Sequence, residues 1–448
     1  NKAVEAVYKF PLPEGCAVCG FNAHVDGRVI CGEVEEREMA FELYDDAIMA
    51  GDGGYLLDEE RPNIFSLSVG NLNPGAEAVI EIEYITLLDV EGAEIRFFLP
   101  TAISPRYIPE EMGDEGGISP DDRIHPPYAS DVPYGLAISL NIHGGNFLEA
   151  VSSPSHQVKI ENMHGDPVRV CFAVTTVKMD RDFVLHMAYK KGAENRAYLQ
   201  RADEEAFIQL DLCLNHEGQS PQDIEKVRDF QGRREIIFLL DCSGSMDGDS
   251  IREAKSALEI CLRGLESGNI FNIYRFGSSY ERLFPESATY SEQTLEKALG
   301  YLRIAKADLG GTEILKPIKK IVSEGSHDET KNTEIILITD GEVGNEEEIF
   351  KIIRKYKDFI RMFAIGIGAG CNEYFIKGAA RAGRGASEFI YPGERIEPKV
   401  LRIFSKATLD TLDDPKILWG TESPKQAPAA PVFFMGSPQT IFARIRPD

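Results

Sequence analysis

The chain has 448 residues, of which 43% are hydrophobic and 27% charged, a composition typical of a globular protein with roughly two to four domains. Its formal net charge of −25 argues against nucleic acid as a partner, because the phosphates would be repelled, whereas it suits cation binding or simple solubility. No apolar run in the sequence reaches the roughly 18 residues that a membrane span needs.

The first 108 residues are predicted to be mainly β-structure with one helix. Residues 18–25 lead into the turn signal Asp26-Gly27, which is typical of a hairpin. Residues 76–84 alternate between apolar and polar side chains, and residues 94–99 are predicted as another strand. Residues 35–50 have the apolar periodicity of a helix. We therefore expect a sandwich-like domain at residues 1–108.

A second β-rich region follows a linker. Residues 109–125 are rich in Pro, Gly and Asp, which is typical of a loop or linker. Short strand patterns then recur between turns, as expected for a second β-sandwich; they lie at residues 136–142, 168–174, 183–187 and 207–212. We assign residues 109–231 to this linker and sandwich.

From residue 232 the pattern changes to alternating strands and helices. Residues 235–240 form a continuous apolar run, which is typical of a strand buried on both faces of a parallel sheet. Strands are predicted at 271–276, 335–339 and 362–367, and helices at 250–265, 291–302, 346–356 and 372–382, with one more starting near residue 312. This alternation predicts a doubly wound, Rossmann-like α/β domain at residues 232–408, with helices on both faces of the sheet.

The last segment, residues 409–448, holds two further strand patterns. A Pro/Ala-rich linker at 424–431 precedes strand-like stretches at 432–435 and 440–445. A lone pair of strands is only marginally stable in water. We therefore expect these strands to return to the second β-sandwich, so that the α/β domain is an insertion in a β platform. Close contact of residues 432–445 with residues 134–214 would support this hypothesis, and a separate C-terminal unit would contradict it.

The ends of the chain and its cysteines bear on the cellular compartment. The chain begins within a strand-like pattern and without Met, and it ends just after a second strand-like pattern. Both ends therefore look cut, and a signal peptide could precede the first residue. Eight cysteines are scattered at irregular spacing, several of them in apolar runs. This spacing is not that of a disulfide scaffold, and it favours a reducing, cytoplasmic location.

Three loops of the α/β domain carry oxygen donors in a pattern that suits one cation. Asp241, Ser243 and Ser245 alternate along the loop after the first parallel strand, so their oxygens can converge. Thr312 follows two glycines before a helix, and Asp340 follows the next long strand. In open α/β sheets ligands bind at the carboxyl ends of the strands. The sequence therefore predicts one site built from these five residues.

The donor types at this site indicate which ion it would bind. Two carboxylates and three hydroxyls, without His or thiolate, favour a hard divalent cation: Mg²⁺ first, with Mn²⁺ or Ca²⁺ as plausible substitutes. An open coordination position would remain, and an incoming carboxylate could fill it, because a divalent cation with two Asp is nearly neutral. Each string alone is weak, since Asp-x-Ser-x-Ser also suits a helix cap. The occurrence of all three strings in loops at the carboxyl edge of the predicted parallel sheet is a much more specific signal.

These motifs resemble those of known families. Asp241-Cys242-Ser243-Gly244-Ser245, Gly311-Thr312 and Thr339-Asp340-Gly341 resemble the metal-ion-dependent adhesion site (MIDAS) of von Willebrand factor A domains, a likeness that covers about residues 232–408. Phe10-Pro11-Leu12-Pro13, Val25-Asp26-Gly27 and the segment 65–75 resemble the vault/inter-α-trypsin (VIT) domain over about residues 1–108, with its first strands missing. The resemblance implies a multidomain α/β plus all-β protein, in which a doubly wound A domain is joined to VIT and a second β-sandwich.

The pairing of the two domains is similar to the inter-α-trypsin inhibitor heavy chains, to vault poly(ADP-ribose) polymerase, and to an intracellular VIT and A-domain group proposed as tumour suppressors. It implies that Asp241, Ser243 and Ser245 coordinate the metal, that Thr312 joins them in the ligand-bound state, and that Asp340 acts directly or through water. The 448 residues contain neither the Asp-Pro-His-Phe segment at which heavy chains attach to hyaluronan nor an ADP-ribosyl-transfer domain.

Three functions are compatible with these motifs. The leading hypothesis is a non-catalytic, divalent-metal-dependent protein–protein interaction module that binds an Asp or Glu of a protein partner. It is favoured because the three loops hold no His, and because Glu342 is expected to be an ordinary exposed loop residue. The second is a scaffold with a structural metal site whose β domains bind the partner. The third is a metal-dependent phosphohydrolase, since an Asp after a parallel strand resembles an aspartyl-phosphate nucleophile; Ser243 occupies the position where such enzymes usually have a second acid. The sequence identifies neither the partner nor the oligomeric state.

Overall fold

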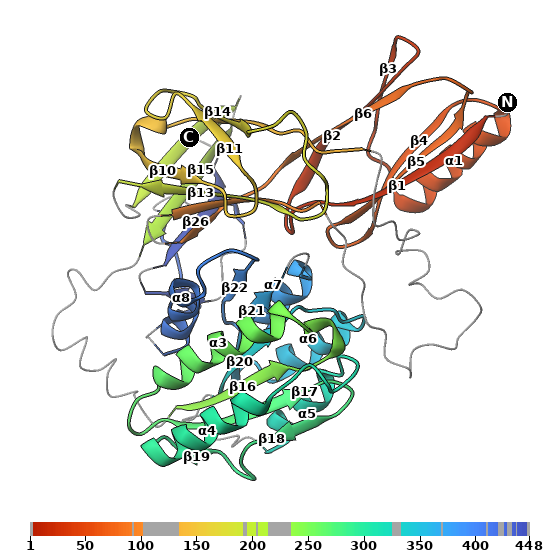
Figure 1. The fold of residues 1–448 in the computed structure, drawn as a ribbon. Coiled ribbons are helices and arrows are strands. Elements are labelled where there is room, and N and C mark those ends of the chain that lie inside the picture. The colour runs from red at the N-terminus through yellow and green to blue at the C-terminus, as the bar shows by residue number, and fades with distance from the viewer. Residues whose placement is uncertain are drawn as a thin grey trace.

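The computed structural model describes residues 3–91, 94–101, 134–190, 195–202, 205–213, 234–324, 333–368, 371–408, 411–419, 425–427, 432–435 and 437–445. An α/β domain lies below two antiparallel β units in Figure 1. The linker predicted at 109–125 and much of the Pro/Ala-rich segment at 424–431 lie outside the described residues. No helix of the described chain is long and apolar enough to span a membrane.

The first β unit consists of two three-stranded sheets and a helix. One sheet has the order β1 (Val4–Pro11), β5 (Ile64–Leu72), β4 (Gly54–Arg61), and the other β3 (Arg28–Cys31), β2 (Ala17–Val25), β6 (Ala78–Ile85). Helix α1 (Arg37–Ala50) forms where the periodicity predicts it. It packs on the β4–β5 hairpin because Gly70 has no side chain: a Cβ there would overlap Ile48, and Tyr44 is close by.

The second β unit is a sandwich with its own core. Its sheets have the orders β10 (Leu148–Ser152), β13 (Phe183–Tyr189), β8 (Glu94–Leu99), β7 (Asp89–Glu91) and β11 (Val158–Glu161), β12 (Val168–Phe172), β9 (Ser139–Ile142). Leu148, Val168 and Phe183 are fully buried between them. The strand predicted at 94–99 forms, but as β8 it pairs with β13 rather than with the N-terminal sheets. We therefore infer that the first unit ends before β7, earlier than the boundary predicted at residue 108.

The α/β domain has the predicted doubly wound sheet. Its parallel strands follow the order β17 (Ile270–Phe276), β16 (Glu235–Asp241), β20 (Thr333–Thr339), β21 (Ile360–Ile367), β22 (Ser387–Ile390), with short antiparallel β18 (Tyr280–Arg282) and β19 (Ala288–Thr289) pairing with β17. Alternate residues of β16 face opposite layers. Phe238 packs with α3 (Asp249–Arg263), α4 (Glu292–Ile304) and α8 (Ile396–Thr408), whereas Leu239 packs with α5 (Leu315–Glu324), α6 (Glu346–Lys355) and α7 (Glu373–Ala382).

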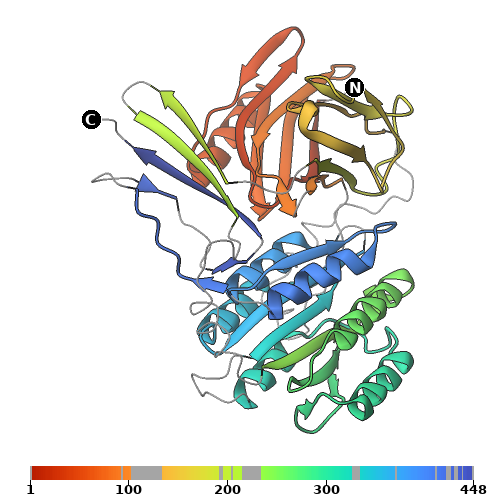
Figure 2. The same ribbon diagram turned by 90° about the vertical axis from the view of Figure 1, so that its left-hand side faces the viewer.

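The C-terminal strands divide between two places. Strand β26 (Pro438–Ile445) pairs antiparallel with β15 (Glu205–Cys213), which lies within the predicted range 134–214 but in a sheet separate from those of the second sandwich, so the return of this segment to the sandwich stays a prediction. These two strands form a separate sheet with β14 (Arg196–Ala202) and β24 (Lys425–Gln426), visible in Figure 2 as a hairpin beside the blue C-terminal strand. Strand β25 (Val432–Phe434) instead packs on the α/β domain, where the rings of Phe434 and Phe363 lie 5.9 Å apart.

A buried ionic cluster joins the second β-sandwich to the α/β domain. Glu394, after β22, accepts hydrogen bonds from His186 Nε2 of β13 at 2.8 Å and from the backbone N of Tyr391 at 2.9 Å, and its carboxylate lies 2.8 Å from Lys399 Nζ. The guanidinium of Arg96 from β8 stacks on the Tyr391 ring. Although burial opposes ionisation, His186 and the charges of Lys399 and Arg96 lower the pKa of Glu394 to about 2. The sandwich is therefore fixed at the carboxyl edge of the parallel sheet.

Candidate metal centre

Asp241 lies fully buried at the carboxyl end of β16, with a different partner on each carboxylate oxygen. Oδ1 accepts a hydrogen bond from the backbone N of Ser243 at 2.9 Å, and Oδ2 accepts one from the Thr339 hydroxyl at 2.5 Å. The Thr339 hydroxyl in turn accepts from the backbone N of Gly341 at 2.9 Å. Both donors give hydrogen bonds to the carboxylate oxygens, and such bonds favour the ionised form. This network therefore holds the Asp241 carboxylate in one orientation.

The hydroxyls of the first loop lie beside the two carboxylates. Ser243 Oγ and Ser245 Oγ are 3.1 Å apart, with Ser243 buried and Ser245 exposed. Ser245 lies close enough to Asp340 for its hydroxyl to lower the pKa of that carboxyl, against the larger effect of burial, which raises it; Oδ1 of Asp340 accepts from the backbone N of Glu342 at 3.2 Å. The structure therefore brings Asp241, Ser243, Ser245 and Asp340 into one connected group of oxygen atoms.

Thr312, the fifth predicted residue, is buried in a loop that the backbone ties to the first loop. The backbone N of Gly244 donates to the Gly310 carbonyl at 2.8 Å, and the backbone N of Leu309 donates to the Cys242 carbonyl at 3.0 Å. Gly310 has a φ of +79°, and a Cβ there would lie 2.7 Å from Ser278 Oγ, so glycine is required for this approach. The Thr312 loop is thus held beside the Asp241 loop at the same sheet edge.

The electrostatics of the group favour a bound cation. Burial, followed by the charge of Asp340, raises the pKa of Asp241, and burial raises the pKa of Asp340. In the part of the chain that the structure describes, neither carboxylate forms an ion pair with Lys or Arg. Two close, buried carboxylates without a counter-charge are unfavourable, and a divalent cation would relieve this. No trio of His, Cys, Asp or Glu side chains suited to a metal occurs within the described residues, so a cation here would depend on the hydroxyls as well.

Sequence reasoning missed several residues that shape this group. Thr339 is one of them, because its hydroxyl orients Asp241. Its position at a strand end, directly before Asp340, is a sequence signal from which this role could have been predicted. Ser278 holds the Thr312 loop by accepting from the backbone N of Gly311 at 2.8 Å. Glu342 is half-buried rather than exposed as expected, and burial with the charges of Asp340 and Asp241 raises its pKa to about 8. Its burial depends on tertiary packing, which the local sequence does not specify.

Protein stripped of divalent cations is expected to lose stability as the pH rises from about 4.5 to 8. The ordinary pKa of Glu342 is 4.5, and folding raises it to about 8. Because the folded state then binds this proton more tightly than the unfolded state, the stabilisation is complete below the unfolded pKa and is lost as the pH rises through the folded one. Urea denaturation in EDTA across this range measures the effect. A free energy of unfolding that rises over the same range would contradict it, whereas added Mg²⁺ is expected to stabilise the protein most at the alkaline end.

Comparison with known proteins gives matches for both regions. Residues 1–84 match the family model of the vault protein inter-alpha-trypsin domain, and residues 234–389 match that of the von Willebrand factor type A domain. The chain is 32% identical over 470 residues to the human von Willebrand factor A domain-containing protein 5A, an alignment that covers 99% of this chain and 58% of that protein. It is 30% identical over 427 residues to a von Willebrand factor A domain-containing protein of Dictyostelium discoideum, covering 94% of this chain and 42% of that one.

Among solved structures, proximal thread matrix protein 1 from the mussel byssus, determined with a zinc-occupied MIDAS motif, matches with a TM-score of 0.33 and 19% identity. That match covers 41% of this chain and 50% of the mussel chain. The chain spans about half the length of the curated relatives it matches.

Proposed function

Because the chain joins a vault protein inter-alpha-trypsin domain to a von Willebrand factor type A domain, we propose that it is a non-catalytic protein–protein interaction module with a divalent cation in its A domain. Asp241, Ser243, Ser245, Thr312 and Asp340 would hold the cation, with Mg²⁺ as the first choice and Mn²⁺ or Ca²⁺ as substitutes. The bound cation would supply a positive centre that attracts an Asp or Glu side chain of the partner.

One observation carries this proposal: two buried carboxylates lie beside hydroxyls, and among the described residues no Lys or Arg pairs with either of them. Ser245 is exposed while Asp241 and Ser243 are buried, so a cation held by these oxygens would meet solvent on the Ser245 side. The network around Asp241 supports cation binding, because the carboxylate oxygens are already held in place and little reorganisation would be needed when a cation binds.

A pull-down from cell extract tests the function. We expect a partner to be retained by the wild-type chain in Mg²⁺, and to be lost both in EDTA and with Asp241→Asn. Asp247→Asn is the matched control, because it removes an exposed charge from the same loop without touching the predicted donors. Retention of the same partner in EDTA would rule out the metal-bridged mechanism.

Two other functions each have an observation in their favour. Glu342 places a half-buried carboxyl two residues from Asp340, which suits the general acid of a metal-dependent phosphohydrolase; metal-dependent turnover in a phosphatase screen would favour that function. The β14–β15–β26 sheet has a groove of about 550 Å³ lined by the partly exposed Tyr198, Leu199, Phe207 and Phe442, which suits a scaffold whose β domains bind the partner. Partner retention that is indifferent to Asp241→Asn but sensitive to Phe442→Ser would favour the scaffold.

We also propose a cytoplasmic location. All eight cysteines are free of disulfide bonds, and three of them are buried in the α/β domain, which supports a reducing compartment. Recovery of the protein from culture medium rather than from cell lysate would contradict this location.

A further inference from the structure

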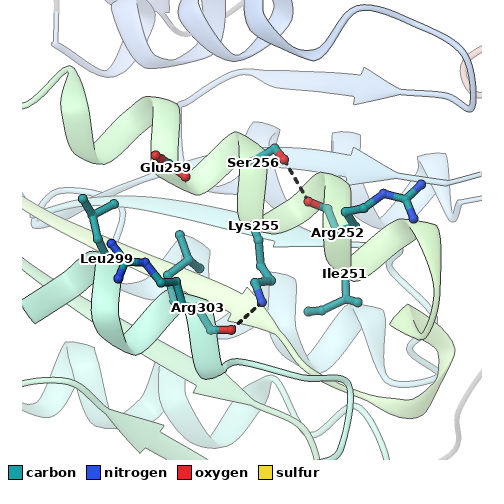
Figure 3. Close-up of a pocket in the computed structure, with 8 residues that line it drawn as sticks. Ile251, Arg252, Lys255, Ser256, Glu259, Leu299 and Arg303 are labelled. Atoms are coloured by element: carbon teal, nitrogen blue, oxygen red, sulfur yellow. Dashed lines mark hydrogen bonds between the residues drawn. The ribbon is translucent and has the colours of Figure 1, made fainter.

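A groove of about 320 Å³ lies on the surface of the α/β domain between α3 and α4 (Figure 3). Its floor is apolar: Leu302 is buried, and Ile251 and Leu299 are partly buried against the core. Three basic side chains line the groove: Lys255 of α3 points down between the two helices, whereas Arg252 of α3 and Arg303 of α4 extend toward its opposite ends, with Glu259 further along α3. The groove is large enough for one or two apolar side chains of a ligand.

The basic side chains of the groove differ in whether they can bind an anionic ligand. The Lys255 ammonium donates to the carbonyls of Arg303 at 2.9 Å and of Ala305 at 3.0 Å, so it is used to hold the end of α4. The Arg303 side chain is exposed, and its guanidinium forms no ion pair among the described residues. Arg252 pairs with Asp249 at 2.7 Å, but both side chains are more than two-thirds exposed, so that pair contributes little and can exchange. Arg303 is thus available to bind an anion, and Arg252 becomes available when its exposed pair with Asp249 exchanges, on a chain whose net charge is −25.

The two helices that line the groove are connected along the chain to loops of the candidate metal centre. Helix α3 begins at Asp249, just after the loop that carries Ser245. The carbonyl of Ala305, which Lys255 holds, begins the segment that leads to Thr312. The two connecting segments are themselves joined by the backbone hydrogen bonds of Gly244 to Gly310 and of Leu309 to Cys242. Both walls of the groove therefore run directly into loops of the metal centre.

We propose that this groove binds the segment of an acidic partner that flanks the carboxylate at the metal centre. The partner would be a peptide segment that carries several Asp or Glu residues and one apolar side chain. The apolar side chain would be buried against Ile251, Leu299 and Leu302, and the flanking carboxylates would pair with Arg252 and Arg303. This inference rests on the proposed function, because the metal-bound carboxylate places the segment in the groove.

The test uses the full chain and a fluorescein-labelled synthetic peptide of roughly twelve residues that repeats Asp-Glu-Leu. Fluorescence anisotropy in Mg²⁺ measures its affinity. We expect the double variant Arg252→Glu/Arg303→Glu to weaken binding by tenfold or more, since each substitution replaces attraction with repulsion. A peptide with Ser in place of Leu is expected to bind several-fold more weakly to the wild-type chain. Lys351→Glu is the matched control, because this exposed lysine lies on α6, on the opposite face of the sheet.

The outcomes separate the groove from the metal centre. If EDTA and Asp241→Asn abolish peptide binding while the arginine variant and the Ser peptide behave like their references, the groove inference is overturned and the proposed function stands. If the arginine variant loses peptide binding while EDTA and Asp241→Asn leave it unchanged, the proposed function is overturned. The metal would then not place the segment in the groove, so the inference falls as well. Calorimetry is expected to show that the arginine variant binds Mg²⁺ as tightly as the wild type does. If the variant loses Mg²⁺ binding, the inference that these arginines bind the peptide is overturned. A wild-type chain that does not bind the peptide overturns the inference outright.

Discussion

Replacing Asp241 with asparagine is expected to weaken Mg²⁺ binding by more than about a hundredfold, since even the residues that only orient metal ligands typically contribute ten- to a hundredfold. Asparagine has nearly the same volume and keeps an oxygen that can accept from Ser243 N or from the Thr339 hydroxyl, so the loop is expected to keep its shape. What the substitution removes is the buried negative charge. Titration calorimetry of Mg²⁺ into the full chain measures the change.

The same variant is expected to be more stable than the wild type when both are free of divalent cations. Burial and the charge of Asp340 raise the pKa of Asp241, which means that the ionised carboxylate destabilises the metal-free fold near neutral pH. Asp247→Asn again serves as the control and should leave both Mg²⁺ affinity and stability unchanged. Wild-type Mg²⁺ affinity in Asp241→Asn would remove Asp241 from the donor set. A less stable metal-free variant would contradict the expected net destabilisation by the ionised Asp241 carboxylate.

The second large effect is expected at the ionic cluster between the sandwich and the α/β domain. Glu394→Gln should lower the free energy of unfolding by about 3 kcal/mol, because it leaves buried positive charges without their main counter-charge. Lys399 and Arg96 are each no more than about 5% exposed, and the Glu394 side chain is 2% exposed. Glu388 lies 3.8 Å from Lys399 and compensates only in part. Urea denaturation followed by circular dichroism measures the loss.

Glu397→Gln is the matched control for this cluster, because Glu397 is an exposed carboxylate only a few residues away. The pH dependence gives an independent check. Since folding lowers the pKa of Glu394 from 4.5 to about 2, its stabilisation is present above pH 4.5 and is lost as the pH falls toward 2. The difference between wild type and Glu394→Gln should therefore shrink over that range. Equal stability of Glu394→Gln and Glu397→Gln at neutral pH would contradict a stabilising role for the cluster.

Local patterns predicted most long elements of the α/β domain, because these carry their signal within a few residues, although helix α8 was not predicted. The continuous apolar run at 235–240 became β16, whose core residues are buried on both faces. Helix α1 was equally clear from its periodicity. The short strand β22 was missed, because four residues are too few for a periodic signal.

The pairing of distant strands could not be predicted in the same way. An alternating pattern indicates that residues 94–99 form a strand, but not that this strand joins β13, whose residues lie almost 90 positions later. The same limit applies to the candidate centre. The donors Asp241, Ser243 and Ser245 lie within one loop and are visible as a motif, whereas the burial of Glu342 depends on how separate elements pack.

The most direct test of the central claim is water proton relaxation of the chain loaded with Mn²⁺, titrated with the Asp-Glu-Leu peptide. We predict that Mn²⁺ binds the wild-type chain in a one-to-one ratio, and that the peptide lowers the number of water molecules bound to the ion as a carboxylate replaces one of them. Asp241→Asn should bind Mn²⁺ only weakly. If wild type and Asp241→Asn bind Mn²⁺ alike, or if the peptide binds and leaves the hydration of the ion unchanged, the proposed metal-bridged recognition of an acidic partner is wrong.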